Sequence, residues 1–101
     1  MDPLAHMMMH LGGYRALTRI MLEVAAEVCD GRLVVEHEGG YSSAYVPYCG
    51  LAVVEELSGL TGSIEDPFLA IFQGIGGQEL QPHQDAAIAR AEAGARRLAA
   101  V

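Results

Sequence analysis

A short run at positions 32–36 that contains adjacent β-branched residues restricts most strongly what this chain can fold into. It reads Arg-Leu-Val-Val-Glu, shows little alternation of polar and apolar residues, and is typical of a strand buried on both faces. Such a strand needs sheet neighbours at its edges and helices on its faces. A chain of 101 residues supplies at most one neighbour, so we expect part of its core to be exposed or paired with another chain.

The composition indicates the same shortage of covering surface. Hydrophobic residues make up 51% of the chain and charged residues 19%, and the mean hydropathy is +0.24. These values exclude intrinsic disorder. The composition is also too apolar for a small domain, which must present much of its surface to water. We therefore interpret residues 1–101 as a single, partial domain.

Charge and cysteine content exclude several classes of partner. Thirteen acidic residues oppose six basic ones, all of them Arg, and the net charge of −7 argues against a nucleic-acid surface. No apolar run reaches the length of a membrane span, so we predict no membrane partner and a cytoplasmic location. Cys29 and Cys49 lack Cys-x-x-Cys spacing, and we expect both to be reduced and buried.

Helices are predicted on both sides of the strand. Residues 11–29 repeat apolar side chains at three- and four-residue steps and stop at Asp30-Gly31, which favours an amphipathic helix. A second helix is predicted over residues 44–57, capped by Ser42 or Ser43. We expect Glu55 and Glu56 to face outward. The residues expected to face inward are Val46, Leu51, Val54 and Leu57. We predict a short helix at residues 68–72. The Ala-rich segment 82–101 is expected to form a peripheral C-terminal helix.

Three weaker patterns suggest chemistry. On a continuous helix Asp2, His6 and His10 would share one face as metal ligands, but Pro3 and the chain end disfavour that helix. The Gly-Ile-Gly-Gly run at 74–77 lacks the third glycine of a dinucleotide fingerprint and predicts a loop. His37 lies at the end of the predicted strand, and we assign it no catalytic role.

The Glu-Gly-Gly-Tyr sequence at residues 38–41 offers two interpretations. One is a tight turn with a tyrosine packed nearby. The other is a phenol, that of Tyr41, held over a cleft where it donates a hydrogen bond to a carbonyl oxygen that gains negative charge. The residue types alone do not decide between them.

Four short motifs follow one another in a fixed order. They are Asp-Pro-Leu at 2–4, Gly-Tyr at 13–14, Gly-Arg-Leu-Val at 31–34 and Glu-Gly-Gly-Tyr at 38–41. This order resembles the C-terminal part of the zinc-dependent histone deacetylase family. Tyr-Val-Pro at 45–47 and the segment 51–57 look like the bacterial branch, the class II-like deacetylases and acetylpolyamine amidohydrolases. The resemblance covers residues 2–72 and implies an α/β fold. The chain would be a fragment of a three-layer α/β/α arginase/deacetylase-like domain, mostly helical with one or two parallel strands.

This resemblance implies roles for four residues. Asp2 matches a zinc ligand of the family, and Tyr41 matches the tyrosine that polarises the acetamide carbonyl. Gly39 and Gly40 would keep the floor of the acyl channel free of side chains. The implied reaction removes acetyl groups from acetyl-lysine or acetylpolyamine with Zn²⁺ as cofactor.

The match is partial. The family's remaining zinc ligands and its tandem catalytic histidines precede the Asp-Pro-Leu motif, so we expect the isolated chain to hold zinc poorly and to be inactive. His10 and Ala5 stand where the family usually has Thr and Gly. The alternative is a non-catalytic helical module that forms homo-oligomers through its exposed apolar surface.

Overall fold

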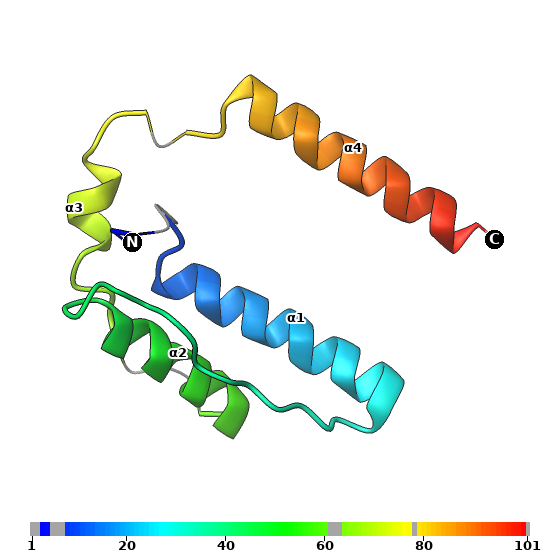
Figure 1. Cartoon of the computed structure of the whole chain (residues 1–101), viewed down its shortest axis with the longest axis horizontal. Helices are drawn as coiled ribbons and strands as arrows, with labels where there is room; N and C mark the ends of the chain where they lie inside the picture. The colour runs from blue at the N-terminus through cyan, green and yellow to red at the C-terminus, as the bar shows by residue number, and fades with distance from the viewer. Residues whose placement is uncertain (1–2, 5–7, 61–63, 78, 101) are drawn as a thin grey trace. The chain divides into compact units, whose positions relative to one another are not determined.

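The computed structural model describes residues 3–4, 8–60, 64–77 and 79–100. The chain divides into two compact units, Met1–Ala70 and Ile71–Val101. Within the described residues the chain forms four helices (Figure 1), which are α1 (Leu11–Cys29), α2 (Val46–Ser58), α3 (Leu69–Gln73) and α4 (Pro82–Ala99). The predicted helices are thus confirmed in order, with boundaries that shift by no more than two residues.

Local signals determine both ends of α1. At its start the His10 ring Nδ1 accepts a hydrogen bond from the backbone N–H of Gly12 at 3.1 Å, which satisfies one of the free donors of the first turn. At its end Asp30 and Gly31 adopt left-handed conformations, with φ of 54° and 74°. The Asp30 N–H donates back to the Ala25 carbonyl, and α1 ends at Cys29 as predicted.

Helices α1 and α2 pack against each other in the first unit (Figure 1). The contact consists of small or short side chains, since Ala25 is 4% exposed and Ala52 only 1%. Leu11 and Thr18 add to this stripe at seven-residue spacing on α1, and Cys49 precedes Ala52 by three residues on α2. Two helices that present small residues can approach closely, and the large aliphatic side chains then lie elsewhere.

The predicted orientation of α2 is wrong. Glu55 is buried, with 8% of its surface exposed, whereas Val54 is 57% exposed. The reason is an ion pair between Glu55 and Arg15 of α1, which turns the acidic side chain toward the neighbouring helix. The start of α2 also differs, because no serine side chain caps it. The Ser42 carbonyl instead accepts hydrogen bonds from the N–H groups of Tyr45 and Val46, both at 2.9 Å.

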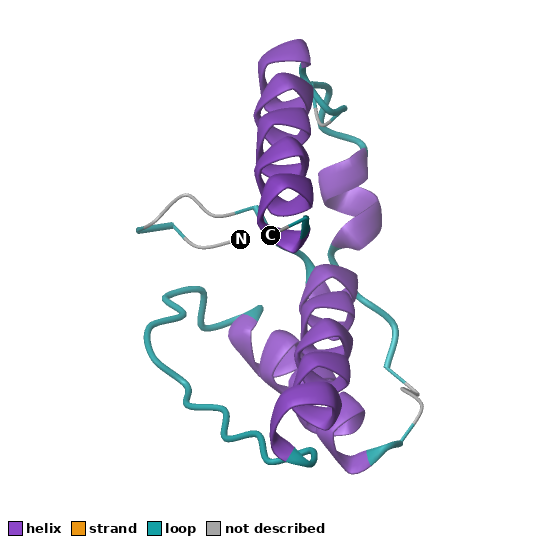
Figure 2. Ribbon diagram, turned by 90° about the vertical axis from the view of Figure 1, so that its right-hand side faces the viewer, coloured by secondary structure: helices purple, strands orange, loops and turns teal. Residues whose placement is uncertain are grey.

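The predicted strand at residues 32–36 is not formed. Among the described residues no strand is present, and the segment between α1 and α2 follows a loop path (Figure 2). Val34 is 93% exposed and Val35 51%, so neither face of the run is buried. A strand exists only when a second one pairs with its backbone, and the described part of the chain provides none. The α/β prediction is therefore confirmed only in its helical part.

Helix α4 lies in the second unit and has no buried residue. The Gln81 N–H donates to the Gln84 side chain at 2.8 Å where the helix begins, and Asp85 lies in its first turn. Arg96 and Arg97 lie in the last turn, where the helix dipole favours positively charged side chains. The helix predicted for residues 82–101 is thus formed over Pro82–Ala99, and its peripheral position stays a prediction. None of the helices in the described ranges is both long and apolar enough to cross a membrane.

Candidate functional site

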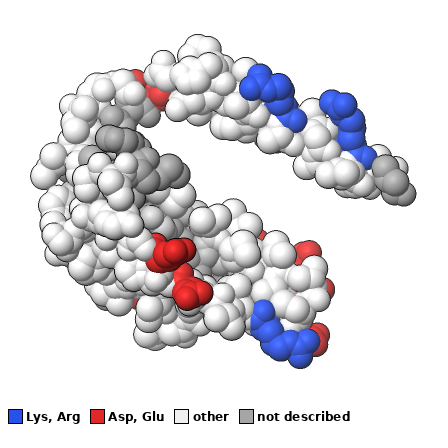
Figure 3. All heavy atoms as spheres, in the orientation of Figure 1, with Lys and Arg blue, Asp and Glu red and all other residues white. Residues whose placement is uncertain are grey.

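A large groove in the first unit is formed by α1, α2 and the segment that connects them. It has a volume of about 810 Å³ and is lined by aliphatic side chains on three sides. These include Leu17 and Met21 from α1, Val54 and Leu57 from α2, and Leu33 and Val35 from the connecting segment. On the face shown in Figure 3, most of the surface of this unit carries neither acidic nor basic side chains. The first part of the apolar repeat of α1, which contains Leu17 and Met21, thus lines this groove.

The Glu-Gly-Gly-Tyr turn borders the groove. Gly39 and Gly40 have φ values of 73° and 83°, a region that side chains disfavour, so the turn depends on both glycines. A Cβ atom on Gly40 would lie 2.8 Å from Cγ2 of Val46 and 3.1 Å from Nε2 of His37. The backbone of the turn therefore packs directly on the first turn of α2.

Tyr41 ends this turn, and four residues separate it from α2. It lines the groove and is 59% exposed, so its ring is not packed in the core. The structure thus brings Tyr41, Gly40 and the groove together, as the second interpretation of the motif requires. Its chemical role remains a prediction.

A cluster of polar groups that was not predicted from the sequence lies where three helices begin. The Asp66 carboxylate accepts hydrogen bonds from the Tyr45 hydroxyl and from the Leu11 N–H, the latter at 3.3 Å. Its other oxygen accepts from the N–H groups of Phe68 and Leu69 at 2.9 and 3.0 Å, which caps α3. The Tyr45 hydroxyl also accepts from the Leu11 N–H at 2.9 Å. The only sequence signal for this cluster is the Asp-Pro pair at 66–67, a common helix start.

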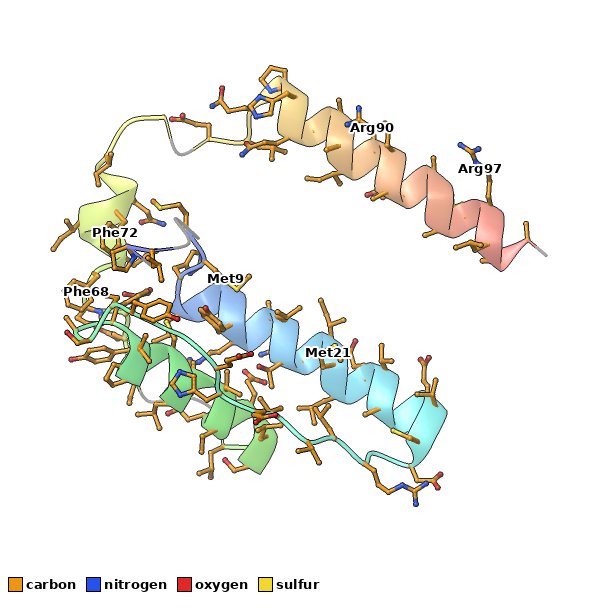
Figure 4. The ribbon with its side chains drawn as sticks, viewed as in Figure 1. Met9, Met21, Phe68, Phe72, Arg90 and Arg97 are labelled. Carbon is orange, nitrogen blue, oxygen red and sulfur yellow. The ribbon has the colours of Figure 1, made fainter. Side chains whose placement is uncertain are left out.

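Burial and charge shape the titration of this cluster. Burial raises the pKa of the Tyr45 phenol above its usual value, and the hydrogen bond to Asp66 acts in the same direction. Burial alone would raise the pKa of Asp66 as well, but the hydrogen bonds that its carboxylate accepts outweigh this effect and lower it. Edge-on contact of the Phe68 ring with Tyr45, at 5.5 Å between centroids, encloses the cluster. Figure 4 shows Phe68 beside the start of α2.

Two ion pairs hold α1 to α2 beside the groove. Arg15 pairs with Glu55, and both side chains are largely buried. Arg19 pairs with Glu56 at 2.7 Å, in a more exposed position. Neither sits in the Tyr41 turn, so their role is to orient the helices that line the groove.

Only one of the three predicted metal ligands, His10, lies within the described residues. Asp2 and His6 lie outside them, and His10 caps α1 through its Nδ1. Residues 8–10 are not helical, so they do not continue α1 toward the terminus as the Asp2, His6 and His10 arrangement would need. Within the ranges that the structure describes, no group of three His, Cys, Asp or Glu side chains could hold a metal ion.

Both cysteines are free, as predicted, but only one is fully buried. Burial raises the pKa of the Cys49 thiol, which lies between α1 and α2. Cys29 is half-buried at the end of α1, and its thiol donates to the carbonyl oxygens of Ala25 and Arg32 at 3.3 and 3.1 Å. The predicted burial of Cys29 is therefore wrong, because Cys29 is the last residue of α1 and is only half-buried there. The Gly-Ile-Gly-Gly run at 74–77 is a loop, as predicted.

Comparison with known proteins gives a consistent result. No family model matches the chain. It is 56% identical over 66 residues to a histone deacetylase-like amidohydrolase of Pseudomonas aeruginosa, a match that covers 65% of this chain and 17% of that protein. It is 41% identical over 54 residues to histone deacetylase 8 of Arabidopsis thaliana, covering 54% and 14%. A probable deacetylase of Archaeoglobus fulgidus is 34% identical over 68 residues, covering 65% and 19%.

The chain spans less than a fifth of the length of each of these relatives. The matches extend over 54 to 68 residues, which is more than half of the chain in each case. The relatives come from a bacterium, a plant and an archaeon, and all three are named as deacetylases or amidohydrolases. The resemblance indicated by the motifs is thereby confirmed, and more than half of this chain is related to a segment of proteins of the histone deacetylase family.

Proposed function

We propose that this chain is the tyrosine-bearing segment of a zinc-dependent deacetylase that removes acetyl groups from acetyl-lysine or acetylpolyamine. The observation that carries the proposal is the placement of Tyr41. It follows a turn of two left-handed glycines, lines an apolar groove and keeps more than half of its surface exposed. A tyrosine that only filled a core would be covered by the helices beside it.

The chemistry assigned to Tyr41 is hydrogen-bond donation. When an acetamide is hydrolysed, its carbonyl oxygen gains negative charge, and a donor already in place stabilises that charge without reorganisation. Gly39 and Gly40 add no side chains beside Tyr41, which leaves room for the acyl chain in the proposed channel. A Cβ at Gly40 would instead meet Val46 and displace the turn.

Zinc does not fit the described residues by themselves. A catalytic zinc takes about three protein ligands, and these residues contain no such group. We assign one ligand to Asp2, by its match to the family motif, and the other ligands and the general base to sequence outside the described residues. The 101-residue chain alone would then be inactive, and residues 1–101 would form one part of a larger α/β/α domain.

The exposed aliphatic side chains support this partial-domain interpretation. Val34, Val28, Val54 and Ile20 are each more than half exposed, although they belong to three consecutive segments of one small unit. Burial of such side chains is worth roughly 1.5–3 kcal/mol each. A chain that leaves them uncovered gives up much of the stability that its composition offers, which is expected of a piece whose core is completed elsewhere.

The test compares the chain alone with a chimera. In the chimera, the matched segment of the Pseudomonas aeruginosa amidohydrolase is replaced by the corresponding 66 residues of this chain. We expect zinc-dependent hydrolysis of an acetyl-lysine peptide by the chimera and none by the 101-residue chain. A folded but inactive chimera contradicts the proposal. Turnover by the chain alone that disappears in Asp2→Ala would instead favour a local site made by Asp2, His6 and His10.

A further inference from the structure

The Asp66 cluster joins the two segments to which the proposed function assigns chemistry. We infer that Asp66 is a positioning residue, which holds the Tyr41 turn and the segment before α1 in a fixed mutual arrangement through Tyr45 and Leu11. This inference rests on the proposed function for its catalytic meaning. The connection itself is a matter of contacts within the first unit.

The first part of the connection runs from Asp66 to the Tyr41 turn. The Tyr45 hydroxyl donates to Asp66 in a part-buried hydrogen bond, and Tyr45 itself is 4% exposed. The N–H groups of Tyr45 and Val46 donate to the Ser42 carbonyl, the residue after Tyr41. The Val46 side chain in turn packs against the backbone of Gly40. Every step between Asp66 and the turn is thus a direct contact.

The second part runs from Asp66 to the start of α1. The Leu11 N–H is shared between the Tyr45 hydroxyl at 2.9 Å and the Asp66 carboxylate at 3.3 Å. Leu11 is itself 4% exposed and begins α1 directly after the segment that contains Asp2. Figure 4 shows Met9, two residues earlier, at this end of α1. Met9 and Tyr41 line the same groove.

Two features indicate that Asp66 does more than cap α3. Capping α3 needs only the Asp66 oxygen that accepts from Phe68 and Leu69. The second oxygen is directed to residues 21 and 55 positions away in the sequence. Hydrogen bonds that hold a reacting group in place matter because a displacement of about 1 Å can cost roughly a hundredfold in rate.

The substitution Asp66→Asn separates the two roles. An asparagine can keep one oxygen toward Phe68 and Leu69, but it presents an NH₂ group to Tyr45 and Leu11, where an acceptor is needed. Tyr45→Phe is the second variant, because it keeps the ring contact with Phe68 and removes only the hydroxyl. Glu65→Gln is the matched control, since it neutralises an exposed carboxylate next to Asp66.

The test is NMR of the ¹⁵N-labelled 101-residue chain, with far-UV circular dichroism as the measure of helix content. In Asp66→Asn and Tyr45→Phe we expect the amide signals of Gly39, Gly40 and Tyr41 to shift and their heteronuclear NOE values to fall, with helix content retained. Glu65→Gln should leave these signals in place. A role confined to capping would move the signals of Phe68 and Leu69 only.

The inference is overturned if both variants keep the signals of residues 39–41 unchanged. It is also overturned if both lose their helix content, because Asp66 would then be needed for folding as a whole. Neither result depends on activity, so the proposed function stands or fails separately through the chimera. In that chimera, a positioning role predicts that Asp66→Asn lowers kcat about tenfold with little change in KM.

Discussion

Replacing Gly40 by alanine tests whether the Tyr41 turn is packed on α2. Gly40 has a φ of 83°, and the added Cβ would lie 2.8 Å from Cγ2 of Val46 and 3.1 Å from Nε2 of His37. Gly59, which ends α2, provides the matched control. Its φ of 70° imposes the same kind of backbone strain, but nothing lies within 4 Å of its Cβ position.

The two variants therefore share one cost and differ in another. A left-handed conformation costs a residue with a Cβ about 1–2 kcal/mol relative to glycine, and both variants lose this amount. Only Gly40→Ala also overfills a packed site, which costs typically about 1–3 kcal/mol. We expect the free energy of unfolding, measured by urea titration with circular dichroism at 222 nm, to fall by at least about 1 kcal/mol more for Gly40→Ala. Equal losses in the two variants would refute the packing of this turn on Val46.

Three further predictions concern the framework of the site. Glu55→Gln leaves Arg15 without its charged partner in a largely buried position, so the free energy of unfolding should fall by about 2 kcal/mol. Glu56→Gln, at the more exposed pair, should lower it by less than about 1 kcal/mol in the same urea titration. Ala52→Leu should destabilise the chain by about 2 kcal/mol because Ala52 is 1% exposed between α1 and α2, while Val54→Ala on the open groove should cost under about 0.5 kcal/mol; similar values for both would place the helix contact elsewhere. The lowered pKa of Asp66 means that its contribution to stability is present above the unfolded value near 3.8 and is lost as the pH falls through the lower folded value. Acid unfolding of the wild type should therefore be steeper than that of Asp66→Asn, and identical acid limbs would contradict this assignment.

Helices were predictable from the sequence because their signals are local. The end of α1 at Cys29 follows from Asp30 and Gly31, which are adjacent in the sequence and take left-handed conformations. The turn at Gly39 and Gly40 follows from the same kind of short-range rule, whereas the exposure of Tyr41 was one of two interpretations that the residue types left open.

Features that depend on distant residues were not predictable in this way. The run at residues 32–36 has the composition of a strand, but pairing requires a second strand, which the described part of the chain does not supply. The inward turn of Glu55 depends on Arg15, forty residues earlier. The Asp66 cluster joins Leu11 and Tyr45 across separations of 55 and 21 residues, and no periodic pattern encodes such contacts.

Hydrolysis by the chimera with and without the Tyr41 hydroxyl shows whether Tyr41 acts in the reaction. Tyr41→Phe keeps the ring in the groove and removes only the proposed donor. The measurement is kcat for zinc-dependent hydrolysis of an acetyl-lysine peptide, and Tyr48→Phe, which removes a tyrosine hydroxyl from α2, is the control. We predict that kcat falls about a hundredfold or more in Tyr41→Phe and stays near the parent value in Tyr48→Phe. An unchanged kcat in Tyr41→Phe would contradict the role of this residue in the reaction.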